Sequence, residues 1–230
     1  MQKRPLYIFM AGDSTMAAYN GFQAPMSGWG QQLERYFDTQ RVRVSDQAIC
    51  GRSAQSFIEE GRLAWLLKGI RPGDYLLIQF AHNDEKLPYE HPAEEFQRYL
   101  REYIDGARQH GANPVLVTPV ERRRFDEAGR LEMTHAPFVE AMKALTLQEQ
   151  VPLLDLNAAT RKLYEELGPE KAKELFCNLA PGEHPNYPDG HEDDTHYCEV
   201  GAELVAGLFT TLLRQSKLEL RNYLREEVGV

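Results

Sequence analysis

Cysteine is scarce in this chain. Its 230 residues include only Cys50, Cys177 and Cys198, an odd number with no CxxC spacing. A disulfide framework needs paired cysteines, so none is expected here. We expect buried or incidental thiols, which is the ordinary state of free cysteine. Cys198 follows His196 closely enough in the sequence to line a site without acting chemically.

Positive charge and long apolar runs are also lacking. The 26 Lys and Arg stand against 35 Asp and Glu, a net charge of −9, which argues against nucleic acid or an anionic membrane as the main partner. No uninterrupted apolar stretch is long enough to cross a bilayer. Residues 1–10 are too short and too polar for a signal peptide. We therefore expect a cytoplasmic location.

The composition that remains is ordinary for a globular protein, with 42% hydrophobic and 27% charged residues. A chain of this length can bury one sizeable core. We predict a single domain over residues 1–230, with a core at about 5–214 and a C-terminal extension at 215–230. The extension is charged and amphipathic. The extension could pack back on the domain or form an oligomer contact, and the sequence does not decide between these. The oligomeric state is not predicted.

Five short apolar segments predict β-strands, and helical segments lie between and after them. The strands are expected at Leu6–Met10, Val42–Ile49, Tyr75–Phe80, Pro114–Thr118 and Pro152–Leu156. Four are near-continuous, as in strands buried on both faces of a parallel sheet, and the more polar Val42–Ile49 is expected at an edge. Apolar residues recur at helical spacing in Gln31–Phe37, Ser53–Lys68, Ala93–His110, His135–Gln150, Asn157–Leu167 and Glu199–Arg214. This alternation predicts an α/β fold, a three-layer α/β/α sandwich around a five-stranded parallel sheet.

The segment Met10–Ala17, MAGDSTMA, carries the strongest functional signal. It places Gly-Asp-Ser directly after an apolar strand, so the hydroxyl of Ser14 lies at the strand's carboxyl end. Ligands bind at that end in open α/β sheets. A serine there is a candidate nucleophile, although Gly-Asp-Ser by itself is also a common turn. A nucleophilic serine further needs a base, a group that orients the base, and donors for a developing oxyanion.

Residues at three other element boundaries can fill these roles. Gly51 follows the second strand, Asn83 follows the third, and Asp193 and His196 precede the last helix. A parallel sheet would bring them to one edge. His196 would accept the proton of Ser14, and Asp193 would hold the far ring nitrogen. The backbone N–H groups at Ser14 and Gly51 and the side-chain amide of Asn83 would form the oxyanion hole. Each residue alone has a structural explanation as a turn or helix cap, whereas their order is far more specific.

In this order the motifs resemble those of the SGNH (GDSL-type) hydrolases, and most of all the bacterial rhamnogalacturonan acetylesterases. The matching blocks are Gly12-Asp13-Ser14-Thr15, Gly51, Asn83, and Asp193-x-x-His196, with Gly28-Trp29-Gly30, Gly51-Arg52-Ser53 and Thr118–Phe125 pointing to the subfamily. The resemblance spans Tyr7–Leu213. It implies a flavodoxin-like fold and a Ser-His-Asp triad that removes O-acetyl groups from pectin-derived rhamnogalacturonan oligosaccharides through an acyl-enzyme.

The chain departs from the family pattern at two positions. Ala81 precedes His82 where the family often has glycine, which would narrow backbone freedom beside the oxyanion donor Asn83. Asp46 stands where the second block often has asparagine. Neither departure removes a catalytic group.

Substrate-binding candidates lie on two loops. Arg122, Arg123 and Arg124 come just after the fourth strand, and arginine binds carboxylates such as those of galacturonate in a bidentate fork. A solvated basic run is the plainer explanation. Local arginines would outweigh the overall −9 charge, because screening at physiological salt acts over roughly 8 Å. Tyr187, in the long loop before His196, is a candidate for stacking on a sugar ring, with loop anchoring equally open.

Other functions stay open on the sequence alone. The segment His184–His196 holds several possible metal ligands, although their spacing is not that of a metal motif, and we expect no metal and no cofactor. An esterase or thioesterase acting on other acyl groups, a lysophospholipase, an esterase of acetylated xylan fragments, and a non-catalytic carbohydrate-binding protein are the alternatives. Acetate release from a panel of substrates separates them.

Overall fold

All five expected strands form in one sheet. The computed structural model describes residues 4–226, and its strands are β1 (Leu6–Gly12), β2 (Val42–Asp46), β3 (Tyr75–Gln79), β4 (Asn113–Val117) and β5 (Leu153–Leu154). Their order is β2-β1-β3-β4-β5 and every pairing is parallel. The α/β class is therefore confirmed, and β2 lies at an edge as its polarity predicts.

The register sets the carboxyl ends of three strands side by side. Met10 of β1 pairs with Asp46 of β2, and Gly12 pairs with Gln79 of β3. Beyond β2 the chain still follows β1, because the N–H of Ile49 donates to the carbonyl of Gly12 at 3.0 Å. Loops that leave β1, β2 and β3 therefore begin at the same edge of the sheet.

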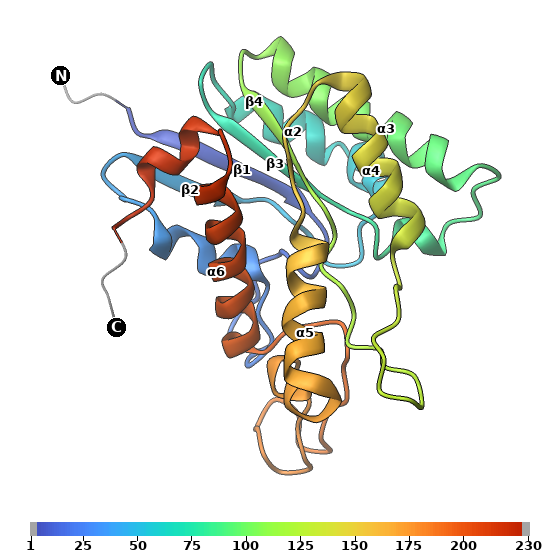
Figure 1. Ribbon diagram of the computed structural model, residues 1–230. Coiled ribbons are helices and arrows are strands. Elements are labelled where there is room, and N and C mark those ends of the chain that lie inside the picture. The colour runs from blue at the N-terminus through green and yellow to red at the C-terminus, as the bar shows by residue number, and fades with distance from the viewer. Residues whose placement is uncertain (1–3, 227–230) are drawn as a thin grey trace.

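Helices cover both faces of the sheet (Figure 1). The first group is η1 (Trp29–Tyr36), α5 (Leu156–Ala172) and α6 (Glu199–Gln215), and the second is α1 (Ala54–Glu59), α2 (Arg62–Gly69), α3 (Pro92–Gln109) and α4 (Ala136–Glu149). Three further 3₁₀ turns are η2 (Asp84–Lys86), η3 (Lys173–Leu175) and η4 (Glu219–Tyr223). Side chains alternate along β1, so Ile8 and Met10 join the core on the first face and Phe9 and Ala11 join the core on the second.

Some helix boundaries differ from the expectations. The predicted helix Ser53–Lys68 is two helices, because Gly61 adopts a left-handed φ of 73° between α1 and α2. Ser53 begins α1 through a capping box with Ser56. The predicted helix Gln31–Phe37 is the 3₁₀ helix η1. The predicted helix Asn157–Leu167 extends as α5, with a kink at Gly168.

The C-terminal extension packs back on the domain as far as the described residues reach. Leu220 is fully buried, and the carbonyl of Tyr223 accepts the N–H of Asp38 at 3.0 Å. Residues 227–230 of the predicted extension lie outside the described range. All three cysteines are free thiols. Across residues 4–226, no helix has both the length and the apolar character that a membrane span requires. The single-domain organisation stays a prediction.

Candidate active site

A tight turn after β1 presents Ser14. The buried carboxylate of Asp13 accepts the backbone N–H and the hydroxyl of Thr15 at 3.0 and 2.8 Å. The backbone carbonyl of Asp13 accepts the N–H of Ala17 at 3.1 Å. Before it, a Cβ on Gly12 would lie 2.9 Å from the carbonyl oxygen of Gln79. Only glycine allows that approach, so the local sequence brings Ser14 sharply out of the sheet.

Ser14, His196 and Asp193 form one hydrogen-bonded line. The Ser14 Oγ lies 2.8 Å from His196 Nε2, and His196 Nδ1 lies 2.7 Å from Asp193 Oδ2. The other carboxylate oxygen, Oδ1, accepts the N–H groups of Thr195 and His196 at 2.7 and 2.8 Å. Burial acts to raise the pKa of Asp193, but these bonds and the His196 charge lower it to about 2. The carboxylate is therefore ionised at neutral pH and can orient the imidazole.

Long-range contacts fix the loop that carries Asp193 and His196. The carbonyl of His196 accepts the N–H of Cys177 at 2.9 Å. The side-chain amide of Asn178 bonds both polar backbone groups of Asp193, donating to its carbonyl at 2.9 Å and accepting its N–H at 3.1 Å. Sequence reasoning missed Asn178, because nothing in its local pattern distinguishes it from any other loop asparagine.

The expected oxyanion donors lie on loops that the structure ties together. Gly51 has a left-handed φ of 78° and is exposed. The Nδ2 of Asn83 donates to the carbonyl of Arg52 at 3.1 Å, and its Oδ1 accepts from Lys86 at 3.1 Å. Ala81 has a φ of 152°, where glycine is favoured, so the expected restriction beside this donor appears as backbone strain. That these groups donate to an oxyanion stays a prediction.

A row of polar side chains, buried at Asp13, His82 and His135, runs from the turn of Ser14. Asp13 Oδ2 is 3.2 Å from His82 Nδ1, and the centroids of the His82 and His135 rings are 4.2 Å apart. The Nδ1 of His135 lies 3.1 Å from Glu85 Oε2, and Glu85 Oε1 pairs with Arg122 at 2.5 Å. Burial lowers the pKa of His82 to about 4, so the ring is neutral at pH 7. This row connects the turn of Ser14 to the loop after β4.

Each of the three predicted substrate-binding arginines forms an ion pair with an acidic residue of the protein. Arg122 pairs with Glu85, Arg123 with Asp194 at 2.6 Å, and Arg124 with Glu132 at 2.9 Å. The exposed fractions of their side chains are 21%, 16% and 70%, in the same order. The three arginines therefore do not form an unpaired basic patch, and only the side chain of Arg124 is largely exposed to solvent. Contact with substrate stays a prediction for all three.

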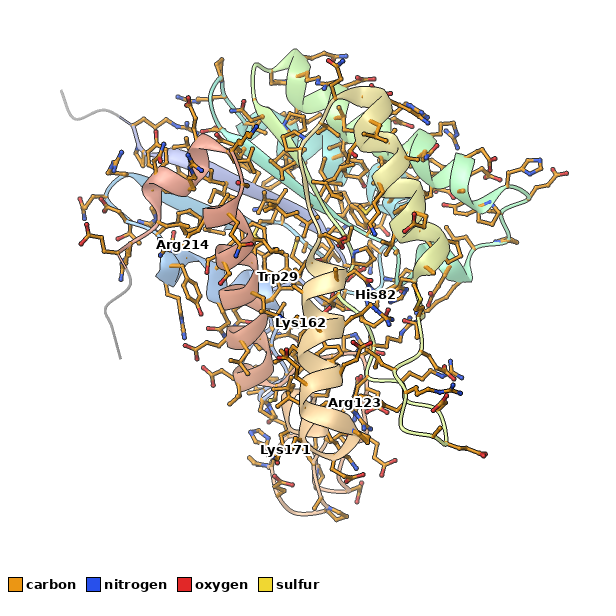
Figure 2. All side chains as sticks on the ribbon, viewed as in Figure 1. Trp29, His82, Arg123, Lys162, Lys171 and Arg214 are labelled. Carbon is orange, nitrogen blue, oxygen red and sulfur yellow. The ribbon has the colours of Figure 1, made fainter. Side chains whose placement is uncertain are left out.

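Trp29 of the Gly28-Trp29-Gly30 motif and the sugar-stacking candidate Tyr187 both have structural partners. Trp29, labelled in Figure 2, is fully buried. It donates to Gln79 Oε1 at 3.0 Å and stacks on Phe209. The hydroxyl of Tyr187 donates to the carbonyl of Gln23 at 3.1 Å, which supports the anchoring of its loop. Sugar stacking by Tyr187 stays a prediction.

The metal alternative for His184–His196 has no ligand set in the structure. Within residues 4–226, no three His, Cys, Asp or Glu side chains gather in a geometry that could hold a metal ion. In that segment His191 lies 3.5 Å from Asp193, the carboxylate that already bonds His196.

Asp46, at the end of β2, makes folding stability depend on pH. Its Oδ1 accepts the N–H of Ala48 at 3.0 Å, while its enclosed Oδ2 has no partner among the described residues. Burial raises its pKa from 3.8 to about 7. In the unfolded chain the carboxyl ionises near its ordinary value, so stability falls as pH rises between about 4 and 7.

We therefore expect Asp46→Asn to raise the free energy of unfolding by up to about 4 kcal/mol more at pH 8 than at pH 4, because the amide carries no buried charge. Urea unfolding at the two pH values measures this. Asp84, whose pKa burial also raises to about 7, is present in both proteins and cancels in the comparison. An equal gain at both pH values would rule out the ionised carboxylate as the cause.

Comparison with known families and sequences connects this geometry to named proteins. The model of the GDSL-like Lipase/Acylhydrolase family matches residues 10–193. Over 229 residues the chain is 48% identical to the rhamnogalacturonan acetylesterase RhgT of Bacillus subtilis (strain 168), covering 100% of this chain and 98% of that protein. It is 35% identical over 225 residues to the probable rhamnogalacturonan acetylesterase YesY of the same organism, covering 96% and 98%.

Solved structures share the fold. Protein YxiM of Bacillus subtilis matches with a TM-score of 0.80 at 28% identity, covering 94% of this chain, which spans 58% of the length of that structure. A catalytic mutant of Axe2, an acetylxylan esterase from Geobacillus stearothermophilus, matches with a TM-score of 0.65 at 16% identity, covering 99% of this chain and 100% of the other. The second likeness shows the fold alone.

Proposed function

The chain belongs to the GDSL-like lipase/acylhydrolase family, and we propose that it removes O-acetyl groups from pectin-derived rhamnogalacturonan oligosaccharides. The family and the relatives named acetylesterases make it an SGNH esterase, a carboxylic ester hydrolase. The observation that carries the proposed chemistry is the line from Ser14 Oγ through His196 to Asp193, with contacts of 2.8 and 2.7 Å. The relative at 48% identity supports the substrate class.

In the first half of the proposed reaction, Ser14 Oγ attacks the acetyl carbonyl carbon while His196 Nε2 takes the hydroxyl proton. Asp193 accepts the Nδ1–H of the resulting imidazolium and stabilises its charge. The carbonyl oxygen becomes an oxyanion, and the N–H groups of Ser14, Gly51 and Asn83 are the donors we propose for it. The tetrahedral intermediate then expels the sugar oxygen, which takes the proton from His196, and leaves acetyl-Ser14.

Water completes the reaction. His196 Nε2 removes a proton from a water molecule, the hydroxide attacks the acetyl carbonyl of Ser14, and the same donors hold the second oxyanion. Collapse of this intermediate releases acetic acid, which ionises to acetate in water, while His196 returns its proton to Ser14 Oγ. The chemistry needs no group beyond these side chains, the backbone donors and water.

The substrate contacts in this proposal come from the loops around Ser14. Arg124 is the predicted guanidinium most open to a galacturonate carboxylate, since 70% of its side chain is exposed. Arg122 and Arg123 would need to leave Glu85 and Asp194 to bind one. Tyr187 would offer its ring to a sugar while its hydroxyl anchors the loop at Gln23. The proposed location is the cytoplasm, where the enzyme would act on oligomers taken up by the cell.

Acetate release from a substrate panel tests the proposal. The panel comprises acetylated rhamnogalacturonan oligosaccharides, acetylated xylan oligosaccharides, p-nitrophenyl esters of increasing chain length, and a lysophospholipid. We expect the highest kcat/KM on the rhamnogalacturonan oligosaccharides and a preference for acetyl over longer acyl groups. Faster turnover of the xylan oligosaccharides would make acetylated xylan the substrate class. A preference for long acyl chains would favour a lipase or thioesterase. No ester hydrolysis on any substrate would favour a binding protein.

A further inference from the structure

Arg123 joins three segments that lie far apart in the sequence. Its backbone N–H donates to the carbonyl of Asp194 at 2.9 Å, and its Nε donates to Asp194 Oδ1 at 2.6 Å. A second guanidinium contact runs from Nη1 to the carbonyl of Pro169 at 2.9 Å, at the kink where Gly168 interrupts α5. Figure 2 shows Arg123 beside this end of α5. One side chain therefore ties the loop after β4 and the end of α5 to the residue after Asp193.

The segment Asp193–Asp194 is held from two directions. Asn178 bonds both backbone polar groups of Asp193 from one segment, at 2.9 and 3.1 Å. Arg123 bonds the carbonyl and the carboxylate of Asp194 from another. Between these anchors the carboxylate of Asp193 reaches His196. Backbone bonds between Leu179 and His191 and between Cys177 and His196 hold the chain on either side, so the side-chain contacts of Asn178 and Arg123 act on the residues between them.

We propose that Arg123 is a positioning residue, which holds the carboxylate of Asp193 in the place where it orients His196. This inference rests on the proposed function, because it assigns the role through the triad. Small misplacements of a catalytic group lower the rate steeply, by about 100-fold for 1 Å. Arg123 would therefore control kcat through Asp194 and Asp193 without touching the substrate.

Its surroundings separate this role from carboxylate binding. The side chain of Arg123 is only 16% exposed, and its guanidinium already donates to Asp194 and Pro169. A galacturonate carboxylate would have to displace Asp194 and leave the carbonyl of Pro169 without this donor. Positioning predicts that removing Arg123 affects every ester alike, whereas substrate binding predicts an effect on acidic substrates only.

The experiment compares Arg123→Gln with wild type on neutral p-nitrophenyl acetate and on an acetylated rhamnogalacturonan oligosaccharide. We expect kcat to fall by about 10- to 100-fold on both substrates by the same factor, with KM changed by less than about 2-fold. Thermal unfolding is measured in parallel, and kcat is compared at a temperature where both proteins are folded. Guanidinium ions at millimolar concentration should restore part of the kcat of Arg123→Ala, and sodium chloride at equal ionic strength should not.

Two further variants complete the design. Asp194→Asn removes the charged acceptor while leaving Arg123, and it should lower kcat on both substrates in the same way. Arg130→Gln is the matched control, since Arg130 lies in the same connection, pairs with Asp126 and is 81% exposed. It should leave kcat unchanged.

The outcomes distinguish the inference from the function on which it rests. A higher KM confined to the acidic oligosaccharide would make Arg123 a substrate contact and overturn the proposal. Unchanged kcat on both substrates, in folded Arg123→Gln and Asp194→Asn, would also overturn it while leaving the triad in place. Failure of the proposed triad mechanism would give a different result, namely turnover that persists when Ser14 is replaced by alanine.

Discussion

Replacing Ser14 by alanine is expected to lower kcat for ester hydrolysis by about 10⁶-fold, the largest effect of any substitution considered. The reason is chemical, because alanine has no oxygen to form the acetyl-enzyme. His196 and Asp193 would remain in place, but His196 Nε2 would lose its partner at 2.8 Å. Initial rates of acetate release, followed at enzyme concentrations high enough to detect the residual rate, measure the loss.

The fold should tolerate this substitution, since Ser14 is at a turn and the change deletes one oxygen. Thermal unfolding of Ser14→Ala should therefore stay close to that of wild type. Ser45→Ala, on the edge strand β2, is a matched serine control that should retain full activity. A serine-directed phosphonate should label wild type at Ser14 and leave Ser14→Ala unlabelled. Near-normal turnover by a folded Ser14→Ala protein would end the triad hypothesis.

Replacing Asn83 by alanine is expected to lower kcat by about 10²- to 10³-fold with little change in KM. The amide of Asn83 has two N–H groups. One donates to the carbonyl of Arg52 at 3.1 Å, which holds the amide in place, and the second is the donor proposed for the oxyanion. Because charge on that oxygen develops only in the transition state, the lost bond appears in kcat. Steady-state kinetics on p-nitrophenyl acetate measure both constants.

Asn83→Asp provides the matched comparison for this prediction. The carboxylate has nearly the same shape but offers acceptors in place of donors, so it should be at least as impaired as Asn83→Ala. Repulsion between the carboxylate and the oxyanion would add to the loss. If KM rose while kcat held in Asn83→Ala, the amide would be binding the ground state and the oxyanion role would be wrong.

Much of the framework of the site could be predicted from local sequence. Near-continuous apolar segments such as Tyr75–Phe80 predicted buried strands, and the polarity of Val42–Ile49 predicted the edge. Because parallel strands end at a common edge, the motifs at Ser14 and at Asp193 to His196 could be expected to meet before any contact was known. The structure brings these side chains within hydrogen-bonding distance.

Helix boundaries were less predictable, because they depend on single dihedral angles. The periodicity of Ser53–Lys68 continues through Gly61, yet its φ of 73° breaks the segment into α1 and α2. Similarly, Gln31–Phe37 has helical spacing, but it forms a 3₁₀ helix packed under α6. Apolar periodicity reports which face is buried, and it does not report which hydrogen-bond pattern the backbone adopts.

The sequence by itself determined the fold class, the order of the strands along the chain and the positions of Ser14, Asp193 and His196 at element boundaries, since these follow from local composition and spacing. Only the tertiary structure decided the partners of polar side chains. The arginines from 122 to 124 looked alike as a basic run, but Arg123 meets Asp194 across 71 residues of chain. Likewise, the burial that raises the pKa of Asp46 comes from surrounding segments. Such contacts depend on distances between segments that no local pattern encodes.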